Sequence, residues 1–586
     1  MRAFFVWLWA ALGISIIVGC GGSSSELVSP ASSGQEQSGD AQSTITESSG
    51  LEDPSETNAQ LARNAVAAGA QTGDEKNYAE AIRYYTEAIG QSPDDAELYQ
   101  ERGLIHALLE QHESAIKDLT QAIDRNRTEA SLYRWRAEEY FESGDFDSAE
   151  RDIENAIALK PENSEFYVVR ASLRAELGRV DEALADYQHA IDLDDRAFHY
   201  YLRGTLQAAL DSPDAALEDL TTAINKEPDQ ADYYLARANV QISLGQPEQA
   251  LADYGKAVEC DPNNANTLQR RAGFLLSQGE NDAAIADLTA ALEREPGLLT
   301  ARRLRGIAYR MAEQYTEAVA DFQTVLDAGL EDDSMRAELL YQQGVALQEK
   351  GNHEEAGNHE EAIEKLKLAT SLKKDFAEAY FAISMSYAEL SSRDPARVDD
   401  AKSYLNRAIE ADPKSSEYLL ARAGLYQAEA EIQKILEEGD PAETIKMAHA
   451  DIQRATEANP NDDTAWYSLA LISTSDGDDQ KALQCLTRAI ELNPGDDRYF
   501  EARADIQLRR QNFLAAIDDY TKALEQNPDR PDLYQARGYA YGEIGRSEDA
   551  ASDFDKADRL TPPATESSSE TDDEQNPETP DPGSPE

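Results

Sequence analysis

The sequence predicts an all-α solenoid of about fourteen helix pairs, and a fixed period carries this prediction. Many prolines lie 34 residues, or twice 34, apart, and a period of that length is the signature of stacked structural repeats. Between the prolines, apolar side chains recur at spacings of three and four residues, as in amphipathic helices. The prolines of this series are Pro93, Pro161, Pro228, Pro262, Pro296, Pro460, Pro494, Pro528 and Pro562.

Each repeat is predicted to hold two helices, which we call helix A and helix B. In the repeat that begins at residue 130, Ala137 and Ala149 are small residues that let the two helices approach closely. Pro161 ends helix B, because proline cannot continue a helix. A glycine near the turn between the helices recurs at Gly144, Gly178, Gly245, Gly279, Gly477 and Gly545.

The repeat resembles the tetratricopeptide repeat, whose pattern W-x2-L-G-x2-Y…A-x3-F…P is nearly literal in one repeat. The residues that carry the resemblance are Trp466, Leu469, Ala470, Ala482, Leu486 and Pro494. The resemblance covers residues 62–564 and implies a right-handed superhelical solenoid. The predicted repeats begin at residues 62, 96, 130, 164, 197, 231, 265, 299, 337, 377, 416, 463, 497 and 531.

Three repeats are longer than the rest, with insertions at 351–362, about 391–397 and about 429–443. The first is the duplication GNHEEAGNHEEA, which contains His353 and His359. Six residues separate the two histidines, so they are out of phase on one helix and do not match a zinc motif. We interpret the duplication as a copied loop at the turn between the helices, and we predict no metal site.

Composition narrows the classes of partner. The chain has 113 Asp and Glu against 54 Lys and Arg, which gives a formal net charge of −59. Nucleic acids and anionic lipid surfaces would repel such a chain, so neither is expected as its main partner. The hydrophobic content of 41% is sufficient for a folded core.

Residues 1–19 read as an export signal, with one cation at Arg2 followed by an apolar run that is short for a bilayer span. The segment Ile17-Val18-Gly19-Cys20 resembles the lipobox of bacterial lipoproteins. That resemblance implies cleavage before Cys20 and lipid attached to Cys20, with the protein on the periplasmic or cell-surface face of a membrane. Gly21 favours the outer membrane. A plain secretory signal with a chance cysteine is the alternative.

Two segments outside the repeats are expected to be disordered. Residues 20–61, which follow the signal, are rich in Ser, Gly and Gln and contain few aliphatic side chains, as in a flexible acidic linker. Residues 565–586 form an acidic, proline-rich tail. Residues 561–586 carry eight carboxylates and no Lys or Arg.

The seventh position of the repeat is usually aliphatic in the tetratricopeptide family, but here it is arginine in ten repeats. In the same ten repeats the twenty-third position is aspartate. The predicted pairs are Arg102 with Asp118, Arg136 with Asp152, Arg170 with Asp186, Arg203 with Asp219, Arg237 with Asp253, Arg271 with Asp287, Arg305 with Asp321, Arg422 with Asp451, Arg503 with Asp519, and Arg537 with Asp553. The other four repeats have neither residue; they carry Ala68/Tyr84, Gln343/Lys365, Ile383/Tyr404 and Leu469/Cys485.

The exceptions indicate which residues are in contact. If each arginine paired with the preceding repeat, Arg102 would face Tyr84; if it paired with the following repeat, Arg305 would face Lys365. Only pairing within one repeat leaves every arginine with an aspartate. We therefore expect ten charge-assisted bridges between helix A and helix B, with a structural role. An arginine ladder that binds ligands is the alternative.

The tetratricopeptide resemblance implies a groove lined by positions two, five, nine and twelve of helix A. The candidate groove residues are Tyr201, Leu235, Asn239, Ile242, Arg303, Arg310, Tyr341, Phe381, Tyr467 and Tyr539. An aromatic-rich groove with scattered polar groups suits an extended peptide or a helix. Packing of several of these side chains against neighbouring repeats is the alternative. Arg303 and Arg310 are candidates for binding an acidic segment of a partner, or for solvated surface.

No glycine-rich phosphate loop, zinc-ligand spacing or nucleophile motif occurs outside the repeats, so we predict no enzyme activity, cofactor or metal. The expected function is a membrane-anchored scaffold for protein-protein interactions in the bacterial cell envelope. Its expected partners are unidentified proteins or peptides, and the lipid bilayer through acylated Cys20. A passive envelope spacer or surface structure is one alternative; an enzyme with chemistry hidden in the repeats, or a non-catalytic region of an enzyme system, is another.

Overall fold

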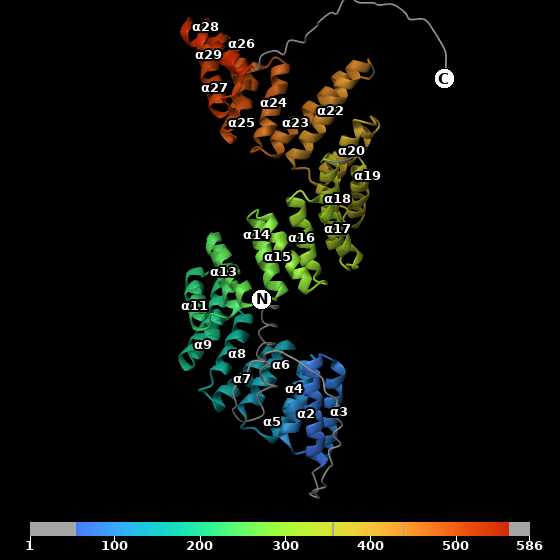
Figure 1. The fold of residues 1–586 in the computed structure, drawn as a ribbon, viewed down its shortest axis with the longest axis vertical. Coiled ribbons are helices and arrows are strands. Elements are labelled where there is room, and N and C mark those ends of the chain that lie inside the picture. Colours follow the sequence, from blue (N-terminus) through green and yellow to red (C-terminus); the bar gives the residue numbers. More distant parts are fainter. Residues whose placement is uncertain (1–53, 354–356, 438, 562–586) are drawn as a thin grey trace, which may run out of the picture. The chain divides into compact units, whose positions relative to one another are not determined.

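The computed structural model describes residues 54–353, 357–437 and 439–561. These residues form helices joined by short turns, with no strand among them (Figure 1). The chain divides into two compact halves, one up to Leu298 and one from Leu299. Cys20, the signal segment and the acidic tail from residue 562 lie outside the described residues.

In the described part of the chain, each half contains seven helix pairs in chain order. The helices of the N-terminal half are α2 (Pro54–Thr72), α3 (Glu75–Gln91), α4 (Ala96–Leu108), α5 (His112–Arg125), α6 (Ala130–Glu142), α7 (Phe146–Leu159), α8 (Ser164–Glu176), α9 (Val180–Leu193), α10 (Ala197–Ala209), α11 (Pro213–Lys226), α12 (Ala231–Ser243), α13 (Pro247–Cys260), α14 (Ala265–Ser277) and α15 (Asn281–Arg294).

The helices of the C-terminal half are α16 (Leu299–Met311), α17 (Tyr315–Asp327), α18 (Asp333–His353), α19 (Gly357–Leu372), α20 (Ala377–Ser391), α21 (Arg397–Ala411), α22 (Ser416–Leu436), α23 (Pro441–Ala458), α24 (Asp463–Ser475), α25 (Asp479–Leu492), α26 (Asp497–Arg509), α27 (Phe513–Gln526), α28 (Pro531–Glu543) and α29 (Ser547–Leu560).

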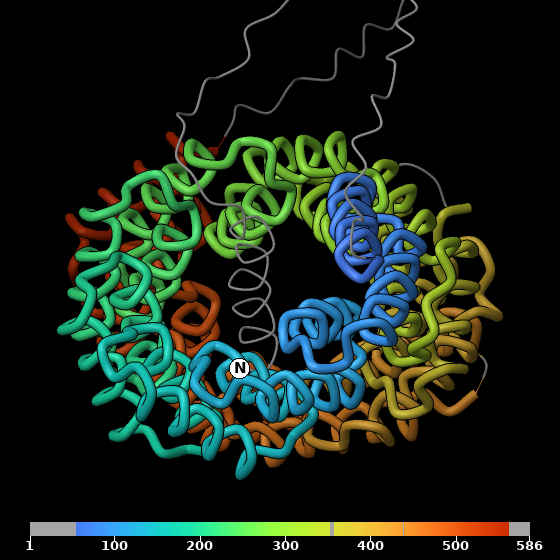
Figure 2. The backbone as a smooth tube through the Cα atoms, turned by 90° about the horizontal axis from the view of Figure 1, so that it is seen from below, coloured from blue at the N-terminus to red at the C-terminus, as the bar shows by residue number. Residues whose placement is uncertain are grey.

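Within each half, a helix packs against the helices before and after it in the chain, and Figure 2 lets the reader follow the tube from one pair to the next. The helix A of one repeat also contacts the helix A of the next in places, as α10 contacts α12. A stack of this kind is the solenoid predicted from the period, in which each pair buries its apolar face against its neighbours.

The three-residue turn between the two helices of a regular repeat places one residue in the left-handed region. Glycine occupies this place at the six predicted positions, with φ between 68° and 82°. In four repeats without that glycine, Glu110, Asp211, Glu313 and Gln511 adopt φ of 55–60° at the equivalent place. The turn geometry is therefore a property of the repeat, and glycine only lowers its conformational cost.

The first helix begins earlier than predicted. Residues 54–61 belong to α2, whereas the sequence analysis assigned them to the linker. Ala59 is buried and continues, at spacings of three and four, the apolar face formed by Ala62 and Val66. The polar neighbours of Ala59 hid this face, so the linker boundary at residue 61 was wrong, and a proline at the first helical position starts the helix instead.

The duplicated segment also differs from its prediction. Its described residues do not form a copied loop: α18 continues to His353 and α19 begins at Gly357, so both helices are lengthened, and residues 354–356 lie outside the described part. The His359 side chain is buried, and Gly351 lies so close to its ring that a Cβ atom there would be 2.8 Å away. In the described residues on either side, the backbone groups are paired within the two helices.

Of the two other insertions, the one at about 429–443 mainly extends helices, whereas the one at about 391–397 lies largely in the turn, residues 392–396. Helix α22 has 21 residues and α23 has 18, compared with 13 and 14 in α24 and α25. In the repeat that begins at residue 377, α20 and α21 have 15 residues each. In the part of the chain that the structure describes, no helix is both long and apolar enough to cross a membrane.

Close packing of helix A on helix B predicts opposite effects for two glycine substitutions. At Gly306 a Cβ would lie 2.7 Å from the buried ring of Phe322, whereas at Gly424 nothing lies within 4 Å. We expect Gly306→Ala to lower the free energy of unfolding by about 1–3 kcal/mol through overpacking. Gly424→Ala, the control, should raise it by about 0.5–1 kcal/mol. Urea unfolding measures both, and equal effects would contradict the packing described.

Candidate partner-binding groove

Ten arginines of helix A each bind the aspartate of helix B in the same repeat. In every pair Nε donates to one carboxylate oxygen and Nη2 donates to the other, with distances of 2.6–2.9 Å. The aspartates are buried, between 4% and 7% exposed. These are the ten pairs expected from the sequence, including Arg422 with Asp451 across the long insertion.

The same arginines also reach a third helix, which the sequence analysis missed. In seven of them within the described residues, Nη1 donates to a side chain on helix B of the preceding repeat. The contacts are Arg102 to Thr86 (2.9 Å), Arg136 to Thr120 (2.9 Å), Arg203 to Gln188, Arg237 to Thr221 (3.2 Å), Arg422 to Asn406 (2.6 Å), Arg503 to Thr487 (3.2 Å) and Arg537 to Thr521 (3.0 Å).

Each such arginine uses three donors toward two partners, so it fixes the two helices of its own repeat and the junction to the preceding one. The hydrogen bonds from Arg237 to Asp253 raise the pKa of that arginine. Little donor capacity remains for a ligand, which argues against an arginine ladder as a binding site.

The structure places a cleft of about 800 Å³ in the N-terminal half, on the side formed by helix A of three consecutive repeats. Its walls come mainly from α10, α12 and α14, with contributions from Asp211 in the turn before α11 and from Pro213 and Leu220 of α11. Of the predicted groove residues, Tyr201, Leu235 and Asn239 line this cleft. Ile242 is 41% exposed at the end of α12 but is not among the lining residues.

Polar groups converge on the cleft from two neighbouring helices. Asn239 accepts a hydrogen bond from the Tyr254 hydroxyl at 3.1 Å, which leaves its amide nitrogen as a donor. Asp232 on α12 and Arg270 on α14 supply opposite charges; burial raises the pKa of Asp232, and Arg270 counteracts that effect. Such a lining offers donors, acceptors and both signs of charge, as an extended segment of a protein requires.

Most of the predicted groove aromatics pack between repeats. Their rings contact an aromatic ring at or near the start of the next helix A. The pairs are Tyr201 with Tyr233 (5.0 Å between ring centroids), Tyr341 with Phe376 (5.0 Å), Phe381 with Tyr418 (4.8 Å) and Tyr467 with Tyr499 (5.0 Å). Tyr201 is only 4% exposed, and burial raises its pKa. These rings therefore act mainly in packing, the alternative that the sequence left open.

The remaining groove candidates differ in their environments. Tyr539 on α28 is 54% exposed. Arg303 is half-buried on α16. Arg310, on the same helix, donates from Nη1 to Glu349 of α18 at 2.9 Å, so its charge is already paired within the array.

A buried ion pair occupies groove positions five and nine of the repeat at residue 130. Arg134, 4% exposed, donates from Nη1 to Glu138 at 2.6 Å. Burial raises the pKa of Glu138 to about 7, although the charge of Arg134 favours the ionised form and Glu139 opposes it. Opposite charges four residues apart were the signal available in the sequence. The pair fills this part of the groove with protein.

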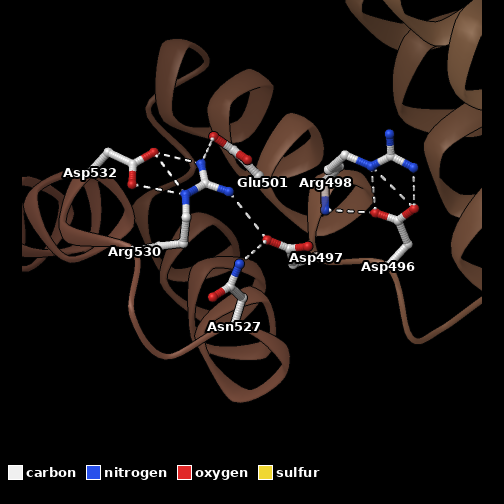
Figure 3. Close-up of polar contacts among 7 residues, drawn as sticks. All are labelled: Asp496, Asp497, Arg498, Glu501, Asn527, Arg530 and Asp532. Carbon is white, nitrogen blue, oxygen red and sulfur yellow. Dashed lines mark hydrogen bonds and ion pairs between the residues drawn. The ribbon is translucent and has the colours of Figure 1, made fainter. Parts of the chain in front are cut away.

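Another polar network joins the last two repeats (Figure 3). Arg530, in the turn before α28, donates to Asp532 beside it and reaches back to Asp497 at 3.2 Å and Glu501 at 2.9 Å on α26. Asn527 donates to the same Asp497 carboxylate at 3.4 Å. Glu501 lies at groove position five, so its charge is engaged by the next repeat.

Among the described residues, no group of three or more His, Cys, Asp or Glu side chains is arranged to hold a metal ion. Cys260 and Cys485 are both free thiols, and burial raises the pKa of each. His359 is buried, and burial lowers its pKa; the side chain of His353 lies outside the described part.

The sequence analysis assigned both Tyr201 and Tyr539 to the groove, but Tyr201 is buried and Tyr539 is exposed. Tyr201→Ala removes a buried ring and should lower the free energy of unfolding by about 3–5 kcal/mol. Tyr539→Ala, the matched control at an exposed position, should change it by less than about 0.5 kcal/mol. Urea unfolding measures both. Unchanged stability for Tyr201→Ala would show that this ring belongs to an open groove after all.

Comparison with solved structures finds chains of similar helical build. The crystal structure of the APC/C hetero-tetramer Cut9–Hcn1 is 14% identical, with a TM-score of 0.35, over 88% of this chain and 96% of that chain. A tetratricopeptide repeat protein from Parabacteroides merdae is 19% identical, with a TM-score of 0.34, over 42% of this chain and 99% of that one. YrrB, a tetratricopeptide protein with an unusual peptide-binding site, is 20% identical, with a TM-score of 0.26, over 31% and 95%.

Because each TM-score is below 0.5, these likenesses carry no functional conclusion to this chain. Among curated proteins, none matches the chain. Family models described as tetratricopeptide repeat match residues 73–130, 136–197, 231–264, 254–286, 275–329, 447–497 and 519–551. Together these segments cover more than half of the sequence. With the stacked helix pairs of both halves, they show that this chain belongs to the tetratricopeptide repeat family.

Proposed function

We propose that the chain is a membrane-anchored tetratricopeptide scaffold that captures a protein partner in the bacterial cell envelope. The single observation that carries the proposal is the cleft between α10, α12 and α14, with its convergent polar groups and both signs of charge. A segment bound there would cross helix A of three consecutive repeats and meet Asn239 of α12 and then Asn266 and Arg270 of α14. Recognition of extended segments by a preformed groove requires no catalytic group.

The rigidity of the wall supports this role. Asn239 is held by Tyr254, and the helices that carry the cleft are clamped by Arg203, Arg237 and Arg271. A preorganised wall loses little conformational entropy when a partner binds, which favours affinity. A passive spacer would gain nothing from a polar cleft of this size.

The proposed anchor is lipid on Cys20, which lies outside the described residues. Its support is the lipobox-like segment Ile17-Val18-Gly19-Cys20 that follows an apolar run. Several acyl chains on one residue would hold the protein stably at a membrane, where one chain would not. The periplasmic or cell-surface face, with the outer membrane favoured, follows from the export signal and from Gly21.

Capture from native membranes tests the scaffold. The intact chain is solubilised in detergent, and its co-purifying proteins are quantified against the double variant Asn266→Ala, Arg270→Glu. Both residues line the cleft and are exposed. We expect a partner present in near-equimolar amount to fall at least tenfold. Cys20→Ser should separately release the chain from the membrane fraction.

The matched control is Arg294→Glu, which makes the same charge change on the exposed surface of α15, outside the cleft lining. It should leave capture unchanged. An abundant chain that co-purifies with no protein near its own amount would overturn the scaffold proposal in favour of a spacer. Equal loss in both variants would show that net charge, and not the cleft, governs capture.

A further inference from the structure

Two consecutive repeats break the arginine–aspartate pattern. In the repeat at residue 337 the paired positions hold Gln343 and Lys365, and in the repeat at residue 377 they hold Ile383 and Tyr404. Both repeats lie in the C-terminal half. An Arg–Asp pair is electrically neutral, so its replacement can leave a net charge on this surface.

In the first of these repeats a lysine replaces the aspartate. Lys365 donates from Nζ to the side-chain oxygen of Gln323 at 3.0 Å, and Gln343 donates to the same oxygen at 3.2 Å. Gln323 stands where threonine accepts from arginine in other repeats. A neutral acceptor is thus shared by two donors, and the positive charge of Lys365 is not neutralised there.

In the second repeat Tyr404 stands at the aspartate position. Tyr404 and Tyr387 both contact Lys367, which belongs to the first repeat. Lys367 donates to the Tyr387 hydroxyl at 2.8 Å and lies 5.2 Å from the centre of that ring and 5.5 Å from the centre of Tyr404. Burial lowers the pKa of Lys367, whereas the contacts with Tyr387 and Tyr404 raise it. The second effect is larger, so the pKa of Lys367 lies above its ordinary value. Lys367 is therefore charged at neutral pH.

A second cation completes the cluster. Arg407 donates from Nη2 to the Tyr380 hydroxyl at 2.9 Å, lies 4.2 Å from the centre of that ring and lies 5.5 Å from the centre of Tyr404. The rings of Tyr387 and Tyr404 stack at 5.7 Å. We call this surface the tyrosine–cation face; its residues are Lys367, Arg407, Tyr380, Tyr387 and Tyr404.

The charges of this face lack counter-ions. None of Lys365, Lys367 and Arg407 has a carboxylate within 4.0 Å in the part of the chain that the structure describes, although the sequence holds 113 carboxylates for 54 cations. Lys367 and Arg407 are exposed to solvent. The tyrosine rings orient both cations without neutralising them, which leaves them free to bind anions.

We propose that the tyrosine–cation face, flanked by Lys365, binds a carboxylate-rich extended segment, and that its occupant is the acidic tail of this same chain, residues 562–586. The tail carries eight carboxylates and no Lys or Arg, and Asp572-Asp573-Glu574 places three of them in succession. Consecutive carboxylates can bind the two cations of the face, Lys367 and Arg407, while Lys365 adds positive charge on the side of α19 that faces α17. The inference does not depend on the proposed cleft, which lies in the other half.

The tail is long enough to reach the face. It follows α29, and eight helix steps separate α29 from α21, which carries Arg407. At 8–10 Å per packed helix the separation is at most about 80 Å. Because the two helices of a pair lie side by side, the stack advances by about one helix width per pair, or about 40 Å over the four pairs α22–α29. Asp572-Asp573-Glu574 follow Thr561 by 11–13 residues, which span about 36–45 Å when extended. Prolines in the tail favour an extended conformation, which limits the entropy lost on binding.

Zero-length coupling with a carbodiimide tests the occupant on the intact chain. The reagent joins a lysine amine to an Asp or Glu carboxyl as an amide, with water taken up by the reagent, wherever the two groups touch. We expect peptides that link Lys365 or Lys367 to carboxylates of 562–586, at least tenfold more often than links from Lys446. Lys446 is the control: it is exposed, lies nearer the tail in sequence, and pairs with Glu443.

High salt and substitutions in the tail test whether charge attraction produces the links. About 1 M salt shortens the screening length to about 3 Å and should abolish the links. Asp572→Asn, Asp573→Asn, Glu574→Gln alters only the tail, so it cannot unfold the array, and it should reduce the links at least fivefold. Mixing isotope-labelled and unlabelled chains shows whether the tail of the same chain supplies the carboxylates.

Three outcomes would overturn the proposal. Tail links no more frequent at Lys365 and Lys367 than at Lys446 would exclude the face as their target. Links that persist in high salt would exclude the charge mechanism. Links from Lys367 to another protein, but not to the tail, would assign the face to an external partner. Loss of capture by the cleft variant, with the tail links intact, would separate this proposal from the scaffold.

Discussion

The position-seven arginine is the interaction on which the array depends. Its guanidinium binds a buried aspartate of its own repeat through two donors and, in at least seven of the described repeats, a side chain of the preceding repeat through a third. Apolar packing alone permits small slips between helix pairs, because hydrophobic contact is not directional. A forked hydrogen bond fixes both distance and angle, so this contact sets the register of neighbouring repeats.

The arginine–aspartate pairing also determines which parts of the surface can contact other molecules. In the ten regular repeats the arginine and aspartate satisfy each other, so this pair itself offers no unpaired charge. In the repeats at 337 and 377 the pair is lost, aromatic packing takes its place, and cations remain without carboxylates. The cleft of the N-terminal half, in contrast, lies on helix A positions that the clamp leaves untouched. Structural and interaction surfaces are thus separated by position within the repeat.

Much of the architecture could be predicted from the sequence. The period gave the fourteen helix pairs, and the shared occurrence of Arg102 with Asp118 and its equivalents predicted which side chains meet. The third contact could also have been found, because Thr86, Thr120 and Thr221 occupy one position of the repeat. A search restricted to pairs within one repeat overlooks a partner in the preceding repeat.

Other features could not be predicted from the period. Groove positions such as Tyr201 were assigned correctly within the repeat, but a periodic pattern does not show that a neighbouring ring, Tyr233, covers the side chain. The duplication at 351–362 was interpreted as a loop because insertions often lie in turns. Its helical outcome depends on burial of His359 against Gly351, which only the packed structure reveals.

A double-mutant cycle between Arg237 and Thr221 tests most directly whether the arginine couples neighbouring repeats. The free energy of unfolding is measured for the wild type, Arg237→Met, Thr221→Val and the double variant. If the 3.2 Å contact sets the junction, the two substitutions should be non-additive, with a coupling of about 1 kcal/mol. Additivity within about 0.3 kcal/mol would contradict the account and confine the arginine to its own repeat.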